Sequence, residues 1–91
     1  MSASEIRVAV VTGGGHGIGR ALCRRLARDG AKVVVVDIDE AAAATVAGEI
    51  GGTARALDVS DEQAVAQLVD EVEQADGPID MFISNAGVGY G

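Results

Sequence analysis

Hydrophobic residues occur along this chain as short continuous runs separated by stretches with helical spacing, and this alternation predicts the order of the secondary structure. A strand is predicted at Val8–Val11, where an apolar run ends at a cluster of glycines. A second is predicted at Lys32–Asp37, which contains four consecutive valines. A weaker strand pattern follows at Thr53–Leu57, and a fourth strand is predicted at Ile79–Ser84. Continuous apolar runs of this length are typical of parallel strands that are buried on both faces.

Three helices are predicted between these strands, from apolar residues that recur every three or four positions. The first spans Gly17–Asp29 and is followed by Gly30, a residue type that often ends helices. The second is predicted to begin after Asp39, whose side chain suits the N-cap position. The third is predicted to begin at Ser60, which together with Gln63 matches a capping box.

Strands that alternate with helices indicate an α/β fold with a parallel sheet. Right-handed crossovers then favour the Rossmann-type three-layer sandwich, with strand order 3-2-1-4 across the sheet. The first two helices should cover one face of this sheet, and the third helix should cover the other.

Composition and charge narrow the classes of partner. The formal net charge of −7 argues against nucleic acid or an anionic membrane as a partner. Cys23 is the single cysteine, so no disulfide can form within the chain, and a reducing, cytoplasmic location is expected. The first residues lack the features of a signal peptide, and the apolar runs are too short to span a bilayer. No metal site is expected.

The loop after the first predicted strand is rich in glycine and runs from Thr12 to Gly19. A tight turn between a strand and a helix needs residues without a Cβ, and a pyrophosphate can approach the backbone closely only where side chains are absent. The helix that begins at Gly17 would direct its free N–H groups and its positive dipole end at the phosphates. Because the glycines follow a predicted strand and open a predicted helix, they indicate a dinucleotide-binding turn.

Asp37 ends the second predicted strand about twenty residues after Gly17, where dinucleotide-binding folds place a carboxylate against the adenosine ribose. Such a carboxylate accepts hydrogen bonds from the ribose hydroxyls and repels a 2′-phosphate. Ile38 follows, at a position where a basic residue would have helped to bind that phosphate. The two residues therefore predict NAD in preference to NADP. The alternative is that Asp37 only caps the next helix.

The glycine loop resembles the Thr-Gly-x-x-x-Gly-x-Gly signature of the short-chain dehydrogenase/reductase family, which the chain matches at Thr12, Gly13, Gly17 and Gly19. The sequence is similar to the family at two later points as well. Asp58 and Val59 match a family pair after the third strand, and Asn85–Gly87 matches the family's Asn-Asn-Ala-Gly motif, with Ser84 at its first position.

This resemblance implies a nicotinamide dinucleotide cofactor and extends the candidate site. Amides around His16–Ile18 would face the pyrophosphate, Asp58 would lie by the adenine, and Asn85–Gly87 would line the ribose. We interpret His16 as a polar loop residue rather than an acid or base, because no carboxylate is visibly placed to orient it. The candidate cofactor-binding residues are Gly13, Gly15, His16, Gly17, Ile18, Gly19, Asp37, Ile38, Asp58, Val59, Asn85, Ala86 and Gly87.

Family catalysis uses a Ser, a Tyr and a Lys, the last two spaced Tyr-x-x-x-Lys. Lys32 is the one lysine and Tyr90 the one tyrosine, so this sequence lacks the motif and no catalytic residue is assigned. We therefore expect residues 1–91 to form one NAD-binding domain, incomplete at its C-terminal end and inactive alone. The longer parent would be a homo-oligomeric oxidoreductase that transfers hydride between NAD and an alcohol or carbonyl. The alternatives are a stand-alone dinucleotide-binding or regulatory module, or another Rossmann-type enzyme such as a methyltransferase, which the two later motifs disfavour.

Overall fold

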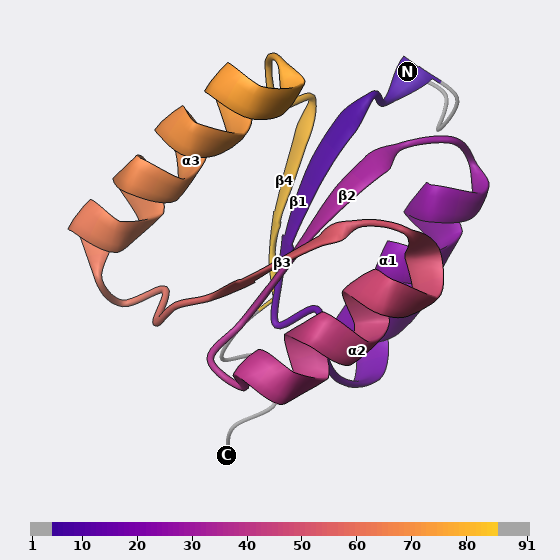
Figure 1. Cartoon of the computed structure of the whole chain (residues 1–91), viewed down its shortest axis with the longest axis horizontal. Coiled ribbons are helices and arrows are strands. Elements are labelled where there is room, and N and C mark those ends of the chain that lie inside the picture. Colours follow the sequence, from indigo (N-terminus) through magenta and orange to yellow (C-terminus); the bar gives the residue numbers. More distant parts are fainter. Residues whose placement is uncertain (1–4, 86–91) are drawn as a thin grey trace.

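A computed structural model describes residues 5–85 and shows a four-stranded parallel sheet with helices on both faces (Figure 1). The strand order is β3-β2-β1-β4, which confirms the predicted Rossmann-type arrangement. In chain order the elements are β1 (Val8–Thr12), α1 (Gly17–Arg28), β2 (Lys32–Asp37), α2 (Glu40–Ile50), β3 (Thr53–Ala56), α3 (Glu62–Asp76) and β4 (Met81–Ser84).

The two central strands form the most buried part of the molecule. Strand β1 pairs in parallel with β2, in a register that places Val8 opposite Lys32, and with β4, in a register that places Ala9 opposite Met81. Every residue of β1 is buried, as are all residues of β2 after Lys32. The edge strands differ, because β3 is exposed throughout and Phe82 of β4 is 40% exposed.

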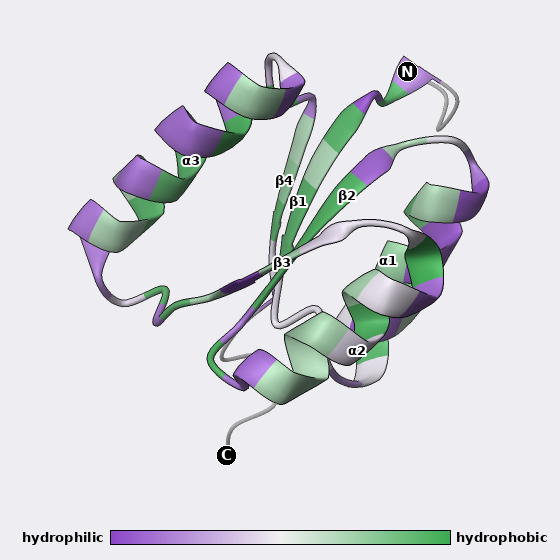
Figure 2. Cartoon of the chain, in the orientation of Figure 1, coloured by the Kyte–Doolittle hydropathy of each residue, from purple (hydrophilic) through white to green (hydrophobic). Residues whose placement is uncertain are grey.

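Alternate residues of the central strands pack against different helices, which explains why both strands are apolar without interruption (Figure 2). On one face, Val11 and Val35 pack with buried residues of α1 and α2. On the other face, Val10 and Val34 pack with Leu68 of α3. The expected division of the three helices between the two faces is therefore confirmed.

The start of α3 corrects one prediction. Asp61, not Ser60, is the N-cap, and its carboxylate accepts a hydrogen bond from the N–H of Ala64 at 3.1 Å. Ser60 instead lies in the preceding turn, where its N–H and hydroxyl donate to Oδ1 of Asp58 at 2.9 and 2.8 Å. The capping box of Ser60 and Gln63 is therefore wrong, because the Asp61 carboxylate, one residue later, accepts the N–H of Ala64 as the cap.

Element boundaries move by one or two residues from those predicted. Helix α1 ends at Arg28, and Gly30 follows with a φ of 99°, a left-handed conformation that glycine adopts readily. Strand β3 ends at Ala56 and β4 begins at Met81 rather than Ile79. Before β4, the Asp80 carboxylate accepts hydrogen bonds from the N–H groups of Arg7 and Val8, which ties the loop to the start of β1. Among the described residues, no helix combines the length and apolar character needed to cross a membrane.

Candidate functional site

The carboxyl ends of the parallel strands bring most of the predicted site residues to one edge of the sheet. Thr12 ends β1, Asp37 ends β2 and Ser84 ends β4, and Thr12 pairs with Ser84 across the sheet. Asp58 follows the end of β3 at the same edge. In open α/β sheets this edge is where ligands bind, beside the strand at which the chain reverses its direction across the sheet.

Two glycines of the loop are required for different physical reasons. Gly17 has a φ of +52°, and a Cβ built there would have no atom within 4 Å, so the space above it is open. Gly19 is tightly packed, because a Cβ there would lie 2.1 Å from the carbonyl oxygen of Gly13. Gly19 therefore allows the loop to pack against the first turn of α1, whereas Gly17 leaves room for a ligand.

Gly14 and Gly15, which come earlier in the loop, pack it against β2 and α2. A Cβ at Gly14 would lie 2.9 Å from Cγ1 of Val35, and a Cβ at Gly15 would lie 2.7 Å from Cβ of Ala42. The N–H of Gly14 also donates to the carbonyl oxygen of Val36 at 3.0 Å. Gly14 is not among the site residues predicted from the sequence, although the run of three glycines that contains it was the available signal.

The N-terminus of α1 differs from those of the other helices. His16 is its N-cap in an extended conformation with no side-chain capping bond, and the first turn contains no acidic residue. The first N–H to bond within this turn is that of Arg20, which donates to the carbonyl oxygen of His16 at 3.2 Å. By contrast, α2 and α3 each begin with a capping aspartate followed by a glutamate. The open end of α1 therefore suits an external anion such as a phosphate.

The Asp37 carboxylate is held firmly beside this open helix end. Asp37 is only 7% exposed, and its Oδ2 and Oδ1 accept hydrogen bonds from the N–H groups of Gly15 and Asp39, each at 3.0 Å. Each oxygen has a further lone pair for a ligand hydroxyl. The N-cap of α2 is Asp39, whose carboxylate accepts from Ala42 at 3.1 Å, so the alternative that Asp37 serves as the helix cap is wrong. Ile38, between them, is 73% exposed.

His16 has a partner that the sequence did not reveal. Its Nε2 lies 3.2 Å from Oδ2 of Asp39, which corrects the expectation that no carboxylate is placed to orient it. The two side chains are 66% and 48% exposed. Hydrogen bonds from the N–H of Ala42 and from His16 lower the pKa of Asp39. The residues are far apart in sequence, so only the packing of the loop against α2 brings them together.

Thr12 and Asn85 join the ends of β1 and β4. The Thr12 hydroxyl donates to the carbonyl oxygen of Ile83 at 3.2 Å and accepts from the N–H of Asn85 at 2.9 Å. The Asn85 amide donates to the carbonyl oxygen of Gly13 at 3.5 Å, which links this strand end to the glycine loop. The predicted residues Ala86 and Gly87 lie outside the described part of the chain.

Asp58 and Val59 complete the predicted set at the end of β3. Asp58 is exposed, and hydrogen bonds from the N–H and hydroxyl of Ser60 lower the pKa of its carboxyl. Val59 is half-buried. The structure therefore places both residues at the carboxyl edge of the sheet, on the β3 side of Asp37.

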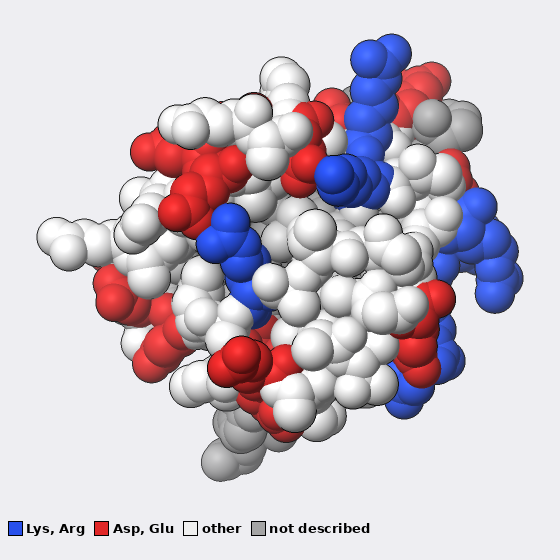
Figure 3. Space-filling view, in the orientation of Figure 1, with Lys and Arg blue, Asp and Glu red and all other residues white. Residues whose placement is uncertain are grey.

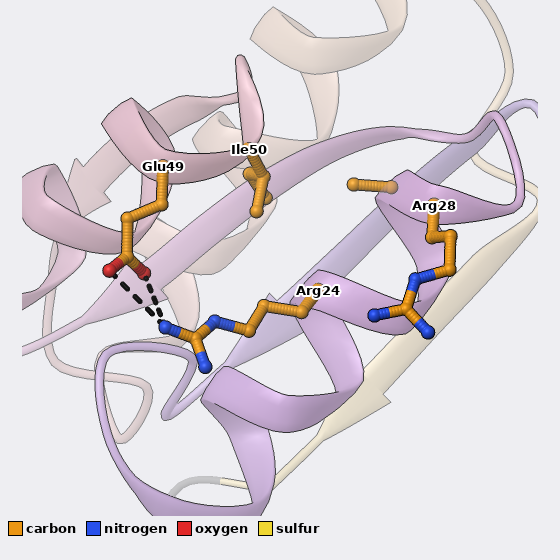
Figure 4. A pocket seen from close by; sticks show the side chains of 5 residues that line it. Arg24, Arg28, Glu49 and Ile50 are labelled. Carbon is orange, nitrogen blue, oxygen red and sulfur yellow. Dashed lines mark hydrogen bonds and ion pairs between the residues drawn. The ribbon is translucent and has the colours of Figure 1, made fainter.

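A shallow hollow lies between the last turns of α1 and α2, at the opposite ends of these helices from the glycine loop. It has a volume of about 450 Å³ and is lined by Arg24, Ala27, Arg28, Glu49 and Ile50 (Figure 4). Arg20 and Arg24 both donate to Glu49, at 2.8 and 3.2 Å, and these contacts lower the pKa of Glu49. Acidic side chains gather instead over α3 (Figure 3). The ion pairs beside this hollow join α1 to α2. The hollow itself is separate from the glycine loop.

Comparison with known proteins extends these observations. A family model described as short chain dehydrogenase matches residues 7–91. Over 84 residues, the chain is 45% identical to the probable oxidoreductase EphD of Mycobacterium tuberculosis and 40% identical to galactitol 2-dehydrogenase of Agrobacterium fabrum. These matches cover 87% and 90% of this chain, but only 14% and 33% of the two relatives.

A solved structure agrees with the sequence matches. The crystal structure of 3-ketoacyl-(acyl-carrier-protein) reductase from Brucella melitensis, complexed with NADH, superposes with a TM-score of 0.79 at 42% identity. The match covers 84% of this chain and 32% of that chain. Because the family model covers nearly the whole sequence and the strand order agrees, this chain belongs to the short-chain dehydrogenase family and forms an NAD(P)-binding region of a family of oxidoreductases.

Proposed function

We propose that this chain binds NAD across the glycine loop and the end of β2, as the cofactor-binding region of an oxidoreductase. The whole protein would transfer hydride between NAD and an alcohol or carbonyl substrate. The observation that carries this proposal is the Asp37 carboxylate, which is nearly buried and is held by two N–H groups beside the uncapped end of α1. When bound, the nicotinamide ring supplies the hydride donor or acceptor.

The pyrophosphate would be bound by the backbone at the start of α1. The N–H groups of Gly17, Ile18 and Gly19 come before the first hydrogen bond within the helix, and no acidic side chain lies in this turn. The open space at Gly17 allows a phosphate to reach them. Since the helix dipole adds a partial positive charge at this end, these residues fit a dianionic pyrophosphate.

The adenosine half would lie along the carboxyl edge of the sheet. Asp37 would accept hydrogen bonds from the ribose hydroxyls, while the exposed side chain of Ile38 provides an apolar contact for the adenine. Asp58 and Val59 would lie by the adenine from the β3 side. The backbone at Asn85–Gly87 would line the ribose from the β4 side.

NAD is preferred over NADP in this proposal because a 2′-phosphate would meet the Asp37 carboxylate. The pair of N–H groups fixes this carboxylate, so it cannot rotate away without losing both hydrogen bonds. Ile38 offers no positive charge to offset the repulsion. A neutral ribose with two hydroxyls instead matches the unused lone pairs of Asp37.

Isothermal titration of the purified protein with NAD⁺ and NADP⁺ tests the proposal. Asp37→Asn keeps one oxygen for a loop N–H group and removes the charge, so we expect NAD⁺ affinity to fall about tenfold or more and the preference over NADP⁺ to narrow. Asp61→Asn, which caps α3 away from the site, serves as the matched control and should change neither affinity. Tighter binding of NADP⁺ than of NAD⁺ by the unaltered protein would overturn the proposed preference.

A further inference from the structure

Four residues form a closed ring of contacts that includes the Asp37 carboxylate. The N–H groups of Gly15 and Asp39 donate to its two oxygens, each at 3.0 Å. Asp39 in turn reaches the imidazole of His16, with 3.2 Å between Oδ2 and Nε2. His16 follows Gly15 in the chain, so the peptide bond between them closes the ring. The Asp39 side chain is therefore anchored to the same glycine loop that binds the Asp37 carboxylate.

The charge of Asp39 is fixed in place but not buried. Its second oxygen accepts the N–H of Ala42 at 3.1 Å as the cap of α2, while its side chain remains 48% exposed. Hydrogen bonds from Ala42 and His16 lower its pKa from an ordinary value that already lies well below neutral pH, so the carboxyl is ionised there. Asp39 thus presents a second negative charge at the edge of the site.

Other charged groups near this ring are few. Glu40 follows Asp39 in the first turn of α2 and is exposed. Arg20 lies one turn along α1 from His16, and its guanidinium is paired with Glu49 at 2.8 Å. Within residues 5–85, His16 is the one group that forms an ion pair with Asp39 when protonated. The net charge of the ring therefore depends on the protonation of His16.

We propose that Asp39 is a second specificity-determining carboxylate of the ribose site, and that His16 controls how much of its negative charge a cofactor phosphate meets. The inference rests on the proposed function, since it takes Asp37 as the residue that meets the adenosine ribose. With His16 neutral, Asp37 and Asp39 both repel the 2′-phosphate of NADP. With His16 protonated, the imidazolium offsets Asp39 and the repulsion weakens. NAD has no phosphate at this position, so its affinity depends much less on either residue.

Asp39→Asn tests the role of the second carboxylate, because asparagine also caps helices well and so preserves the start of α2. The measurement is the ratio of the dissociation constants of NADP⁺ and NAD⁺ at pH 8 and low ionic strength. We expect this ratio to fall by roughly fivefold. That is the effect expected in a solvated site when one negative charge near a dianionic phosphate is removed. NAD⁺ affinity should stay within about twofold of the original. Asp61→Asn again provides the matched control and should leave the ratio unchanged.

His16→Gln tests the modulating role, because glutamine keeps a polar side chain but cannot become a cation. The same ratio is measured between pH 8 and pH 5.5, a range in which histidines take up a proton. The 2′-phosphate itself gains a proton at about pH 6, which lowers the ratio equally in both proteins. We expect the ratio of the unaltered protein to fall about twofold to fivefold further than that of His16→Gln.

The outcomes separate this inference from the proposed function. If NAD⁺ binds and Asp37→Asn weakens it, but Asp39→Asn leaves the ratio unchanged, Asp39 is only a helix cap and the inference is overturned alone. If the pH profiles of the unaltered protein and His16→Gln run parallel, the modulating role of His16 is overturned. If the folded, unaltered protein binds neither dinucleotide, the proposed function and this inference fail together.

Discussion

Gly19→Ala is expected to disrupt the glycine loop, because the added methyl group has no space. A Cβ at this position would lie 2.1 Å from the carbonyl oxygen of Gly13 and 2.8 Å from Nδ2 of Asn85. The nearest of these atoms belongs to the backbone, which cannot turn aside as a flexible side chain can. Relief of the overlap therefore requires the loop to move away from α1.

That movement would disturb contacts that join three segments of the site. The carbonyl of Gly13 accepts the amide of Asn85, and the N–H of Asn85 donates to Thr12 at the end of β1. Overpacking of this kind in a buried site costs about 1–3 kcal/mol, and we expect a loss of about 2–3 kcal/mol here because backbone atoms must shift. NAD⁺ binding should weaken as well, since the displaced loop carries the N–H groups proposed to bind the pyrophosphate.

Equilibrium urea denaturation, followed by far-ultraviolet circular dichroism, measures the loss directly. Gly48→Ala is the matched control, because Gly48 lies within α2 and a Cβ there would meet no atom within 4 Å. That substitution should stabilise the protein by about 0.5–1 kcal/mol through the better helix propensity of alanine. If Gly19→Ala proved as stable as the original protein and bound NAD⁺ equally well, the close packing of Gly19 against Gly13 would be refuted.

Three further predictions concern other positions. Gly17→Val should abolish NAD⁺ binding, because the valine side chain enters the open space of the loop and the left-handed backbone at this position adds a strain of about 1–2 kcal/mol. Unchanged affinity in a folded variant would contradict the pyrophosphate assignment. Burial raises the pKa of the Cys23 thiol to about 11, so at pH 8 a thiol reagent should label it only after denaturant is added, and rapid labelling of the native protein would show that the loop opens. Phe82 is 40% exposed on the edge strand β4, so the 91-residue chain studied alone should self-associate in sedimentation experiments. Phe82→Lys should reduce this self-association. Equal association of the unaltered chain and the variant would place the contact elsewhere.

Local patterns in the sequence were sufficient to predict the strand order, and they picked out residues that the structure brings to one edge of the sheet. The cofactor-binding roles of these residues stay predictions. The continuous apolar runs of β1 and β2 can be buried only if both faces of the sheet are covered, which requires helices on both sides. The glycine loop and Asp37 were predicted because their positions relative to the strand ends follow from the geometry of the βαβ unit. Such features depend on residues close in sequence, where covalent geometry limits the possible arrangements.

The N-cap of α3 shows where local patterns were insufficient. Ser60 and Asp61 are adjacent, and both are good capping residues. The choice between them depends on the turn after β3, in which Asp58 takes the N–H and hydroxyl of Ser60 and leaves Asp61 to cap the helix. Spacing along the sequence does not show how that turn closes.

Contacts between distant segments were decided only by the tertiary structure. The His16–Asp39 pair depends on how closely the loop packs against α2, and the Thr12–Asn85 bond depends on the register of β1 with β4. The different roles of Gly17 and Gly19 are also visible only in the tertiary structure, since Gly17 faces open space and Gly19 faces the carbonyl oxygen of Gly13. Side-chain identity determines which contacts are chemically possible, but the packing of helices on the sheet determines which atoms come within hydrogen-bonding distance.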